Sequence, residues 1–218
     1  MDSEADALRR LKELGAATVY EALGRVGAMD HAIKPLDPGF SVVGRAFTVD
    51  SAPGDNLAVH YGAHLAGEGD VLVVDAKEFT AAGPWGDVLS EYAQKKGIAG
   101  LVIDGAVRDS RAIVGLGFPV FCRDVCIKGT DKVNLGRVGE PIVCGGVTVR
   151  PGDVIVGDAD GVTVVPQELV DEACAAGARR EQAEAGYRTA IAGGASLIDL
   201  IKVRDTLDAA LAARKPGS

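Results

Sequence analysis

Two nearly identical apolar segments constrain the fold of this chain more than any other feature. GDVLVVDA spans residues 69–76, and GDVIVGDA repeats it at 152–159 with two changes. A nearly continuous run of branched apolar residues predicts a strand that is covered on both faces, as in the sheets of α/β proteins. Two such strands, each entered through a Gly-Asp turn, indicate pseudo-symmetry within one sheet and not a short-period solenoid.

Strands and helices alternate between these two copies. After the second copy, Asp160-Gly161 predicts a hairpin turn, a long helix is expected over 167–186, and Ser196 is expected to begin a last helix. We therefore predict an α/β fold, with helices packed on a mixed sheet, as one compact domain over residues 1–218. The sequence divides it into N-terminal helices at 3–26, a core at 40–166 and C-terminal helices at 167–213.

Composition restricts the classes of partner. The chain has 218 residues and a formal net charge of −8, with acidic and basic residues interspersed, whereas a nucleic-acid partner requires a concentrated basic surface. No apolar run approaches the roughly 20 residues of a membrane span. The N-terminal sequence MDSEADALRR also lacks the basic and then apolar pattern of a signal peptide. We expect a cytoplasmic protein with neither nucleic acid nor membrane as a partner.

The segment DGAVRDS, residues 104–110, follows the predicted strand IAGLVID and precedes a predicted helix. Ligands of parallel sheets gather where strands lead into helices. Arg108 offers a planar fork that matches a carboxylate, and Asp109 could hold a metal ion. The same two residues also fit an ordinary interpretation, in which Asp109 caps the helix and pairs with Arg108. The residues alone leave both interpretations open.

A second candidate segment is PWGDVLSEY, residues 84–92. Gly86 permits close approach of the backbone, and a helix is predicted over 87–96. The backbone amides of Val88 and Leu89 could therefore face an anion, with the Asp87 carboxylate beside them. Two helix starts on either side of one strand favour a site for a carboxylate and a metal ion.

Other polar residues are weaker candidates. His60 and His64 are four residues apart, but Tyr61 stands where the glutamate of a zinc-protease motif would be, so we expect packing or surface roles. Lys77 follows the first apolar strand and could form a Schiff base, although a surface role is the simpler interpretation. Glu181 and Glu184 fit a solvated helix face, with Arg180 as the i,i+4 partner of Glu184.

Several motifs together resemble the RraA-like family: GDNLAVH, GDVLVVDA, WGDVLSEYA, GLVIDGAVRDS, KGT, IVCGGVTVRPGDVIVGDADGVTVVP and RREQAE. Within that family they are most similar to the metal-dependent 4-hydroxy-4-methyl-2-oxoglutarate / 4-carboxy-4-hydroxy-2-oxoadipate aldolases. The resemblance extends over roughly residues 15–205. It implies a layered fold of the swivelling β/β/α type, and a homotrimer or homohexamer with sites at subunit boundaries.

The resemblance also implies roles for particular residues. Arg108 would bind the pyruvate part of a small 2-oxo acid substrate, and Asp109 would anchor Mg²⁺ or Mn²⁺ through a shell rich in water. The amides of Val88 and Leu89 in the Gly86 loop would hold the substrate carboxylate, with Asp87 near the waters of the metal. Glu181 and Glu184 would reach the site of a neighbouring subunit. Ala112 departs from the family pattern, which has an acid at this position.

The expected reaction suits these residue types. Retro-aldol cleavage of a 4-hydroxy-2-oxo acid expels a pyruvate enolate, whose charge a divalent metal and Arg108 could stabilise. A water of the metal shell, oriented by Asp87 or by a glutamate of a neighbouring subunit, could take the proton of the C4 hydroxyl. Loss of CO₂ from oxaloacetate gives the same enolate, so decarboxylase activity is expected too. The alternative is a non-catalytic regulator of ribonuclease E that acts by protein binding. Relatives of that kind typically lack the aspartate, so Asp109 favours an enzyme.

Overall fold

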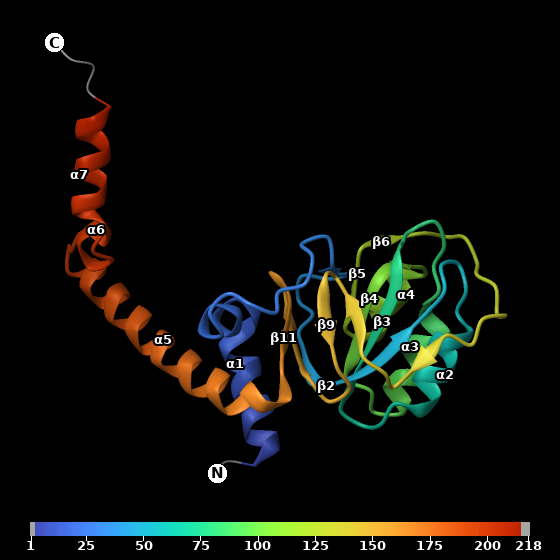
Figure 1. The fold of residues 1–218 in the computed structure, drawn as a ribbon. Helices are drawn as coiled ribbons and strands as arrows, with labels where there is room; N and C mark the ends of the chain where they lie inside the picture. Colours follow the sequence, from blue (N-terminus) through green and yellow to red (C-terminus); the bar gives the residue numbers. More distant parts are fainter. Residues whose placement is uncertain (1–2, 215–218) are drawn as a thin grey trace. The chain divides into compact units, whose positions relative to one another are not determined.

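The computed structural model of the protein describes residues 3–214. They form two compact units, which divide between Gly177 and Ala178. In chain order the elements are α1 (Glu4–Ala22), β1 (Lys34–Pro35), β2 (Val42–Asp50), α2 (Leu57–Leu65), β3 (Asp70–Phe79), α3 (Asp87–Lys95), β4 (Gly100–Val107), α4 (Ser110–Leu116), β5 (Val120–Cys122), β6 (Asp124–Val125), β7 (Arg137–Val138), β8 (Ile142–Cys144), β9 (Val147–Val149), β10 (Val154–Asp158), β11 (Gly161–Val165), a 3₁₀ turn (Gln167–Leu169), α5 (Val170–Ala192), α6 (Leu197–Leu200) and α7 (Arg204–Ala213) (Figure 1).

The first unit is built around one mixed sheet in the order β1-β5-β4-β3-β2-β10-β11, with short β6 and β7 paired to β4 and β2. Strands β2, β3, β4 and β5 are parallel, whereas β10, β11 and β1 join antiparallel to their neighbours. The end strands β1 and β11 contact each other, so the sheet nearly closes into a barrel. The predicted α/β fold with a mixed sheet is confirmed.

The two copies of the repeated segment flank the same strand. Arg45 of β2 lies opposite Asp70 of β3 on one side and Val154 of β10 on the other. Because β3 is parallel to β2 and β10 is antiparallel to it, the two copies run in opposite directions. β10 also turns through Asp160-Gly161 into β11, as the hairpin prediction required.

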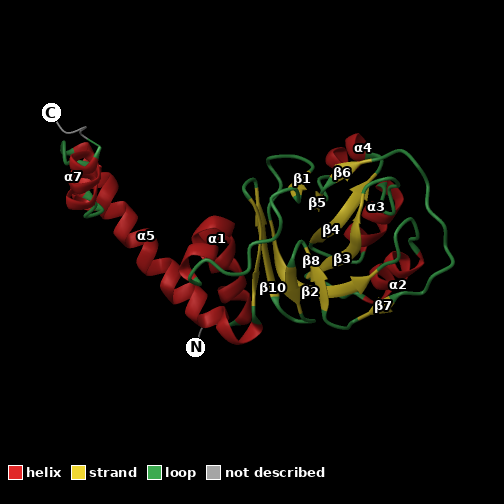
Figure 2. Cartoon of the chain, turned by 45° about the horizontal axis from the view of Figure 1, so that its top comes forward, coloured by secondary structure: helices red, strands yellow, loops and turns green. Residues whose placement is uncertain are grey.

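Both faces of the sheet are covered. Leu72 and Val74 of β3 belong to a core shared with helices α2, α3 and α4, whereas Val71 and Val73 belong to a second core with the β8–β9 hairpin. Figure 2 shows the strands of the sheet with these helices and β8 beside them. All four side chains are fully buried, which explains why this strand reads as a continuous apolar run. Each such side chain contributes about 1.5–3 kcal/mol through burial.

A third core lies between α1 and the β10–β11 hairpin. Ser3 and Asp6 form the predicted capping box at the start of α1. Gly15 interrupts the helix with φ 77° and ψ 163°, and the amide of Ala16 donates to Asp158 Oδ2 at 2.7 Å. The predicted break between two helical segments is therefore present, and an aspartate of the β10–β11 turn binds the start of the second segment.

Four predicted boundaries were wrong. The helix expected over 167–186 begins at Val170 after the 3₁₀ turn and continues to Ala192. β4 does not end at Asp104 but continues to Val107, so half of DGAVRDS is strand. The predicted strand over FPVFCRDV is divided into β5 and β6 at Arg123, whose side chain pairs with buried Asp104. The helix expected from Ser196 is broken into α6 and α7, with Lys202 at a φ of 57° between them.

The second unit contains the later part of α5 together with α6 and α7. Its helices carry exposed apolar side chains, among them Ile191, Leu197 and Leu211. Across residues 3–214, no helix is both long and apolar enough to cross a membrane.

Candidate active site

A glycine-containing loop between β3 and α3 lies against the end of β4. The amide of Gly83 donates to Lys128 O at 2.9 Å. A Cβ added at Gly83 would lie 2.7 Å from Cys126 O and 2.9 Å from Arg108 N, distances at which a larger residue would clash. A glycine is therefore needed here for the loop to meet both the 126–136 segment and the residue that follows β4.

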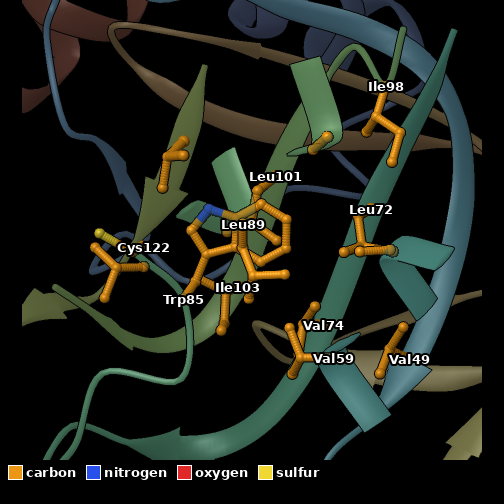
Figure 3. Packing of buried hydrophobic residues seen from close by; sticks show 14 of the residues in the cluster. Val49, Val59, Leu72, Val74, Trp85, Leu89, Ile98, Leu101, Ile103 and Cys122 are labelled. Atoms are coloured by element: carbon orange, nitrogen blue, oxygen red, sulfur yellow. The ribbon is translucent and has the colours of Figure 1, made fainter. Parts of the chain in front are cut away.

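Trp85 fixes this loop in place. Its side chain is fully buried, stacks on Phe118 with ring centroids 6.1 Å apart, and packs near Leu89, Leu101 and Ile103 (Figure 3). The indole Nε1 donates to Ser90 Oγ at 2.7 Å, and this hydroxyl donates to the carbonyl of Gly86 at 3.0 Å. The carbonyl of Trp85 accepts from the amide of Arg108 at 2.8 Å. The loop and the Arg108 backbone are thus held as one rigid assembly.

Gly86 is the N-cap of α3, and no side chain caps the helix there. The amides of the first helical turn have no acceptor within the helix and carry the positive end of its dipole. One of them, the amide of Val88, donates to Asp87 Oδ1 at 2.7 Å. The start of α3 therefore offers hydrogen-bond donors to an anion, and the neighbouring carboxylate occupies one of them.

Arg108 and Asp109 follow β4 directly. Asp109 is in the left-handed region, with φ 57° and ψ 32°, and stands at the N-cap of α4 without a side-chain capping bond. Its Oδ2 lies 3.2 Å from Arg108 Nε, and both side chains are partly exposed. The structure thus contains the ion pair but not the capping bond of the ordinary interpretation. A non-glycine residue in this backbone region is a strained feature of the kind that concentrates at functional sites.

These parts surround a cavity of about 320 Å³. Its wall includes five residues predicted from the sequence, namely Gly86, Asp87, Val88, Leu89 and Arg108. Asp109 does not line the cavity, but its carboxylate contacts Arg108, which does. The remaining lining residues are Asn56, His60, Gly83, Pro84, Trp85, Gly129, Thr130 and Lys132.

Asn56 and Lys132 are polar lining residues that the sequence did not single out, and His60 was considered only as a weak candidate. His60 was expected to have a packing or surface role, and in the structure its half-buried side chain lies in the wall of the cavity. Burial and then the nearby charge of Lys132 hold the pKa of His60 below its usual range. GDNLAVH and KGT were recognised as motifs, but their convergence depends on the chain path over 126–136, which has no periodic pattern.

Asp55 holds the 126–136 segment in place through hydrogen bonds. Its Oδ2 accepts from the amides of Val133 at 2.8 Å and Asn134 at 3.0 Å, and its Oδ1 accepts from the amide of Leu57 at 2.9 Å. Burial alone would raise the pKa of Asp55, but these hydrogen bonds outweigh it, so the pKa lies below its ordinary value. One buried carboxylate thus joins the start of α2 to the loop that carries Lys132.

Lys77 has a different environment from that of a Schiff-base lysine. Its Nζ lies 2.6 Å from Asp50 Oδ1 and 2.5 Å from Asp75 Oδ2. Burial opposes the charge, but the two carboxylates outweigh it and raise the pKa of Lys77. A nucleophilic lysine requires a lowered pKa, so this arrangement favours a structural role.

Glu181 and Glu184 lie on α5 in the second unit and are not among the residues that line the cavity. Glu184 Oε1 is 3.1 Å from Arg180 Nε, which is the i,i+4 pair that the sequence predicted, and its Oε2 is 3.2 Å from Arg188 Nη2. The role of both glutamates in the site of a neighbouring subunit stays a prediction.

Ala112, where the family pattern has an acid, is exposed on the first turn of α4. Its amide donates to Asp109 O at 2.9 Å, and the residue does not line the cavity. The Ala112 side chain is therefore not part of the cavity lining.

The donor set determines which metal ion would fit. Within residues 3–214, no group of three or more His, Cys, Asp or Glu side chains could hold an ion. Zinc, which takes three or four protein ligands, does not fit this arrangement. Mg²⁺ keeps several waters and binds through one or two carboxylates together with substrate oxygens, which suits the partly exposed Asp109.

Comparisons with known proteins show which chains are similar to this one. The chain is 45% identical over 165 residues to a protein of Halalkalibacterium halodurans provisionally named 4-hydroxy-4-methyl-2-oxoglutarate aldolase, covering 76% of this chain and 79% of the relative. A crystal structure of an uncharacterized protein from Pseudomonas syringae pv. tomato matches with a TM-score of 0.83 at 30% identity, covering 93% of this chain and 96% of that one.

A third similar protein has a different described function. The structure of Streptomyces coelicolor RraAS2, described as an unusual member of the RNase ES inhibitor RraA protein family, matches with a TM-score of 0.76 at 30% identity. It covers 86% of this chain and 99% of that one. The sequence model of the RraA-like family, described as Aldolase/RraA, matches residues 16–164, which include the loop, the Arg-Asp pair and the whole cavity lining. The chain belongs to the RraA-like family.

Proposed function

We propose that the protein is a divalent-metal-dependent lyase that cleaves 4-hydroxy-2-oxo acids to pyruvate and a second keto acid. Substrates such as 4-hydroxy-4-methyl-2-oxoglutarate or 4-carboxy-4-hydroxy-2-oxoadipate fit this class, and oxaloacetate decarboxylation is a second activity. The observation that carries the proposal is the convergence of Arg108 and the first amides of α3 in one cavity, with the Asp109 carboxylate 3.2 Å from Arg108. The name of the relative at 45% identity supports it.

The proposed substrate-binding groups are hydrogen-bond donors, which favour an anionic ligand. The guanidinium of Arg108 binds the pyruvate part of the substrate through two parallel hydrogen bonds. The amides of Val88 and Leu89 hold the carboxylate at the start of α3. The Val88 amide is paired with Asp87 Oδ1 in this structure, so the incoming carboxylate replaces Asp87 as its acceptor. Binding therefore releases the Asp87 carboxylate for a hydrogen bond to another group.

Asp109 is the residue that would hold Mg²⁺ or Mn²⁺. A divalent ion there supplies positive charge to the C2 keto oxygen, where negative charge develops in the reaction. Arg108, fixed to the loop through its own amide, adds a second positive contact that needs no rearrangement.

The bond that breaks joins C3 to C4. Its electron pair moves into the C2–C3 enolate of pyruvate, while the C4 hydroxyl loses its proton and becomes the carbonyl of the second product. The released Asp87 carboxylate holds the water that takes this proton and later returns a proton to C3. With oxaloacetate, the C3–C4 bond breaks to release CO₂ and the same enolate forms, so Arg108 and Asp109 have the same roles.

The active assembly that we propose is a homotrimer or homohexamer. Glu181 and Glu184 of one subunit then contribute carboxylates at the boundary with the next. Substitution of both by glutamine would lower turnover without altering the cavity lining of the same chain.

The test is pyruvate release from oxaloacetate and from 4-hydroxy-4-methyl-2-oxoglutarate with Mg²⁺, with and without a chelator. We expect turnover that the chelator abolishes, and loss of turnover in both Arg108→Ala and Asp109→Ala. Arg111→Ala is the matched control, because Arg111 is exposed beside the pair and does not line the cavity. Full activity of either site variant as a folded protein would refute the proposal. Turnover that resists the chelator and is trapped by borohydride would indicate a Schiff-base lysine instead.

The structural similarity to RraAS2 favours a second candidate function, regulation of ribonuclease E by protein binding. Under this alternative, the protein inhibits RNA cleavage by ribonuclease E, and Asp109→Ala inhibits as well as the wild type. Absence of lyase turnover with Mg²⁺ or Mn²⁺, together with such inhibition, would support the regulator and exclude the enzyme.

A further inference from the structure

A second cavity, of about 220 Å³, lies between α1 and β11. Its wall comes from three segments, which are the middle of α1, the loop over 28–31 and the turn and strand over 160–163. Within residues 3–214, its lining has no residue in common with that of the active-site cavity, the one that Arg108 lines. A molecule bound between α1 and β11 would therefore be held by neither Arg108 nor the start of α3.

Residues with small side chains leave this space open. Ala16 and Ala17 lie on α1 beside the cavity. Ala28 lies opposite Thr163 in an isolated antiparallel bridge. Gly161, which has φ 147°, contributes no side chain to the wall. Larger residues at these four positions would fill the cavity, so its existence depends on three alanines and a glycine.

The side chain of Thr163 faces α1. Two hydrogen bonds between the neighbouring residues flank the bridge to Ala28, so Ala28 and Thr163 are a non-hydrogen-bonded pair with side chains close together on one face. Val165, two residues further along β11, belongs to the core between α1 and the β10–β11 hairpin. Because side chains alternate along a strand, Thr163 is on this face too.

Thr163 provides an independent indication of a ligand. The residue is 1% exposed, and its Oγ1 has no hydrogen-bond partner in the part of the chain that the structure describes. A buried hydroxyl without a partner is unfavourable, and most such groups in folded proteins are paired. One residue of the cavity wall thus carries a hydroxyl that the protein leaves unpaired and that a ligand could satisfy.

The charged residues of the wall disfavour an anionic ligand. Asp30 and Asp160 belong to the described lining, which contains no lysine or arginine. Asp30 Oδ1 accepts from the amide of Ala32 at 2.9 Å, and this bond, with Arg123 beside it, holds the pKa of Asp30 below its usual range. A carboxylate would meet like charge here. The oxo acids of the proposed lyase reaction are therefore not the expected ligands.

Size and wall chemistry define the ligand further. The volume of about 220 Å³ equals about seven waters at about 30 Å³ each, which is room for one six-membered ring with one substituent. Met29 and the three alanines form an apolar wall, and Tyr20 supplies an aromatic ring for stacking. The Thr163 hydroxyl can both donate and accept, so another hydroxyl is its best-matched partner.

We propose that the cavity between α1 and β11 is a second binding site, for a small uncharged ring compound that carries one hydroxyl group. The ring lies against Met29, Tyr20 and the alanines, and its hydroxyl forms a hydrogen bond with Thr163. The ligand differs in charge and in polarity from the oxo acids of the active-site cavity. The proposal does not depend on the lyase, because the two cavities have separate linings within residues 3–214.

The test compares phenol with toluene, which has the same shape but lacks the hydroxyl. The full chain is labelled with ¹³C in its alanine and threonine methyl groups, and NMR spectra are recorded during titration. We expect phenol to shift the methyl signals of Ala17, Ala28 and Thr163 with a Kd on the order of 1 mM, as suits so small a ligand. Toluene should bind at least about fivefold more weakly, because it leaves the Thr163 hydroxyl unpaired.

Thr163→Val replaces the hydroxyl by a methyl group of similar volume and should reduce the preference for phenol to within about twofold. Thr148→Val is the matched control, because Thr148 is an exposed threonine of β9 that does not line this cavity, and it should keep the preference. Ala17→Leu places a larger side chain in the cavity at an exposed helical position that tolerates leucine, and should weaken both ligands at least about tenfold.

Three results would overturn the proposal. They are equal Kd values of phenol and toluene for the wild type, an unchanged preference in Thr163→Val, and phenol-induced shifts that persist in Ala17→Leu, which would show adventitious binding only. Because the measurement is a binding shift and not turnover, an inactive wild type in the pyruvate assay would refute the lyase and leave this site standing.

Discussion

Substitution of Gly86 by alanine tests the site by steric displacement alone. A Cβ added at Gly86 would lie 2.5 Å from Asp109 Oδ2 and 3.2 Å from Arg108 Nε. Real Cβ atoms essentially never approach closer than 3.0 Å, so the carboxylate must move by about 0.5 Å or more. Both charges remain, and only their positions change.

The expected loss of activity is large and the expected loss of stability is small. A misplacement of about 1 Å can cost about 100-fold in rate, so a shift of about half that distance predicts a 10- to 100-fold fall in kcat/KM for oxaloacetate. Gly86 has φ −149°, which alanine adopts without strain. Alanine is a weaker N-cap than glycine but reduces the entropy of the unfolded chain, so the free energy of unfolding changes by about 1 kcal/mol at most.

The assay pairs pyruvate release with thermal unfolding. A change of about 1 kcal/mol corresponds to about 2–4 °C in Tm for a chain of this length. Gly115→Ala is the control, because a Cβ there meets nothing within 4 Å and the residue lies inside α4 near the same pair. Wild-type kcat/KM in a folded Gly86→Ala protein would show that the positions of Arg108 and Asp109 do not determine catalysis.

Three further substitutions test the structural frame by thermal or urea unfolding. Asp55→Asn replaces an acceptor of loop amides and should lower the free energy of unfolding by about 1–3 kcal/mol. Because the pKa of Asp55 is depressed in the folded state, the free energy of unfolding of the wild type should fall as the pH drops below about 4. The variant should lose less stability over the same pH range. Lys96→Met removes three bonds to carbonyls at the end of α2 and should destabilise by about 1–3 kcal/mol, whereas Lys95→Met, at an exposed surface pair, should cost less than about 1 kcal/mol. Gly62→Ala places a Cβ 2.3 Å from Val49 Cγ2 and should cost about 1–3 kcal/mol, and an unchanged Tm would contradict the packing.

Sequence patterns predicted a helix or strand correctly where the residues that determine it lie within that element. The helix predicted over 87–96 is α3 at Asp87–Lys95, because its apolar spacing and terminal Gly97 act within the segment. The repeated apolar strands were predicted for the same reason, since both faces of β3 are buried. The Gly86 loop and the Arg108–Asp109 pair were predicted to lie close together from the parallel-sheet rule. In the structure, Arg108 lines one cavity with the loop, and Asp109 contacts Arg108.

Long-range contacts decided the features that sequence reasoning missed. Asp104 to Val107 resemble a polar turn in the sequence, but Arg123 neutralises Asp104 inside the protein and β6 pairs with the end of the strand. His60 shares the cavity wall with Lys132, whose segment is hydrogen-bonded to Asp55 beside the start of α2. Asp55 lies 78 positions from Val133, and Asp104 lies 19 positions from Arg123, so neither contact is recorded in a local periodicity.

Under the proposed function, the backbone conformation of Asp109 implies a conflict between stability and catalysis. With φ 57°, this position would be occupied most comfortably by glycine. Selection for thermostable variants of the chain would therefore favour Asp109→Gly, which relieves the backbone strain. The same substitution removes the proposed metal anchor. Heat resistance and turnover would move in opposite directions at this residue, so a stabilised scaffold for practical use should leave position 109 outside the mutated set.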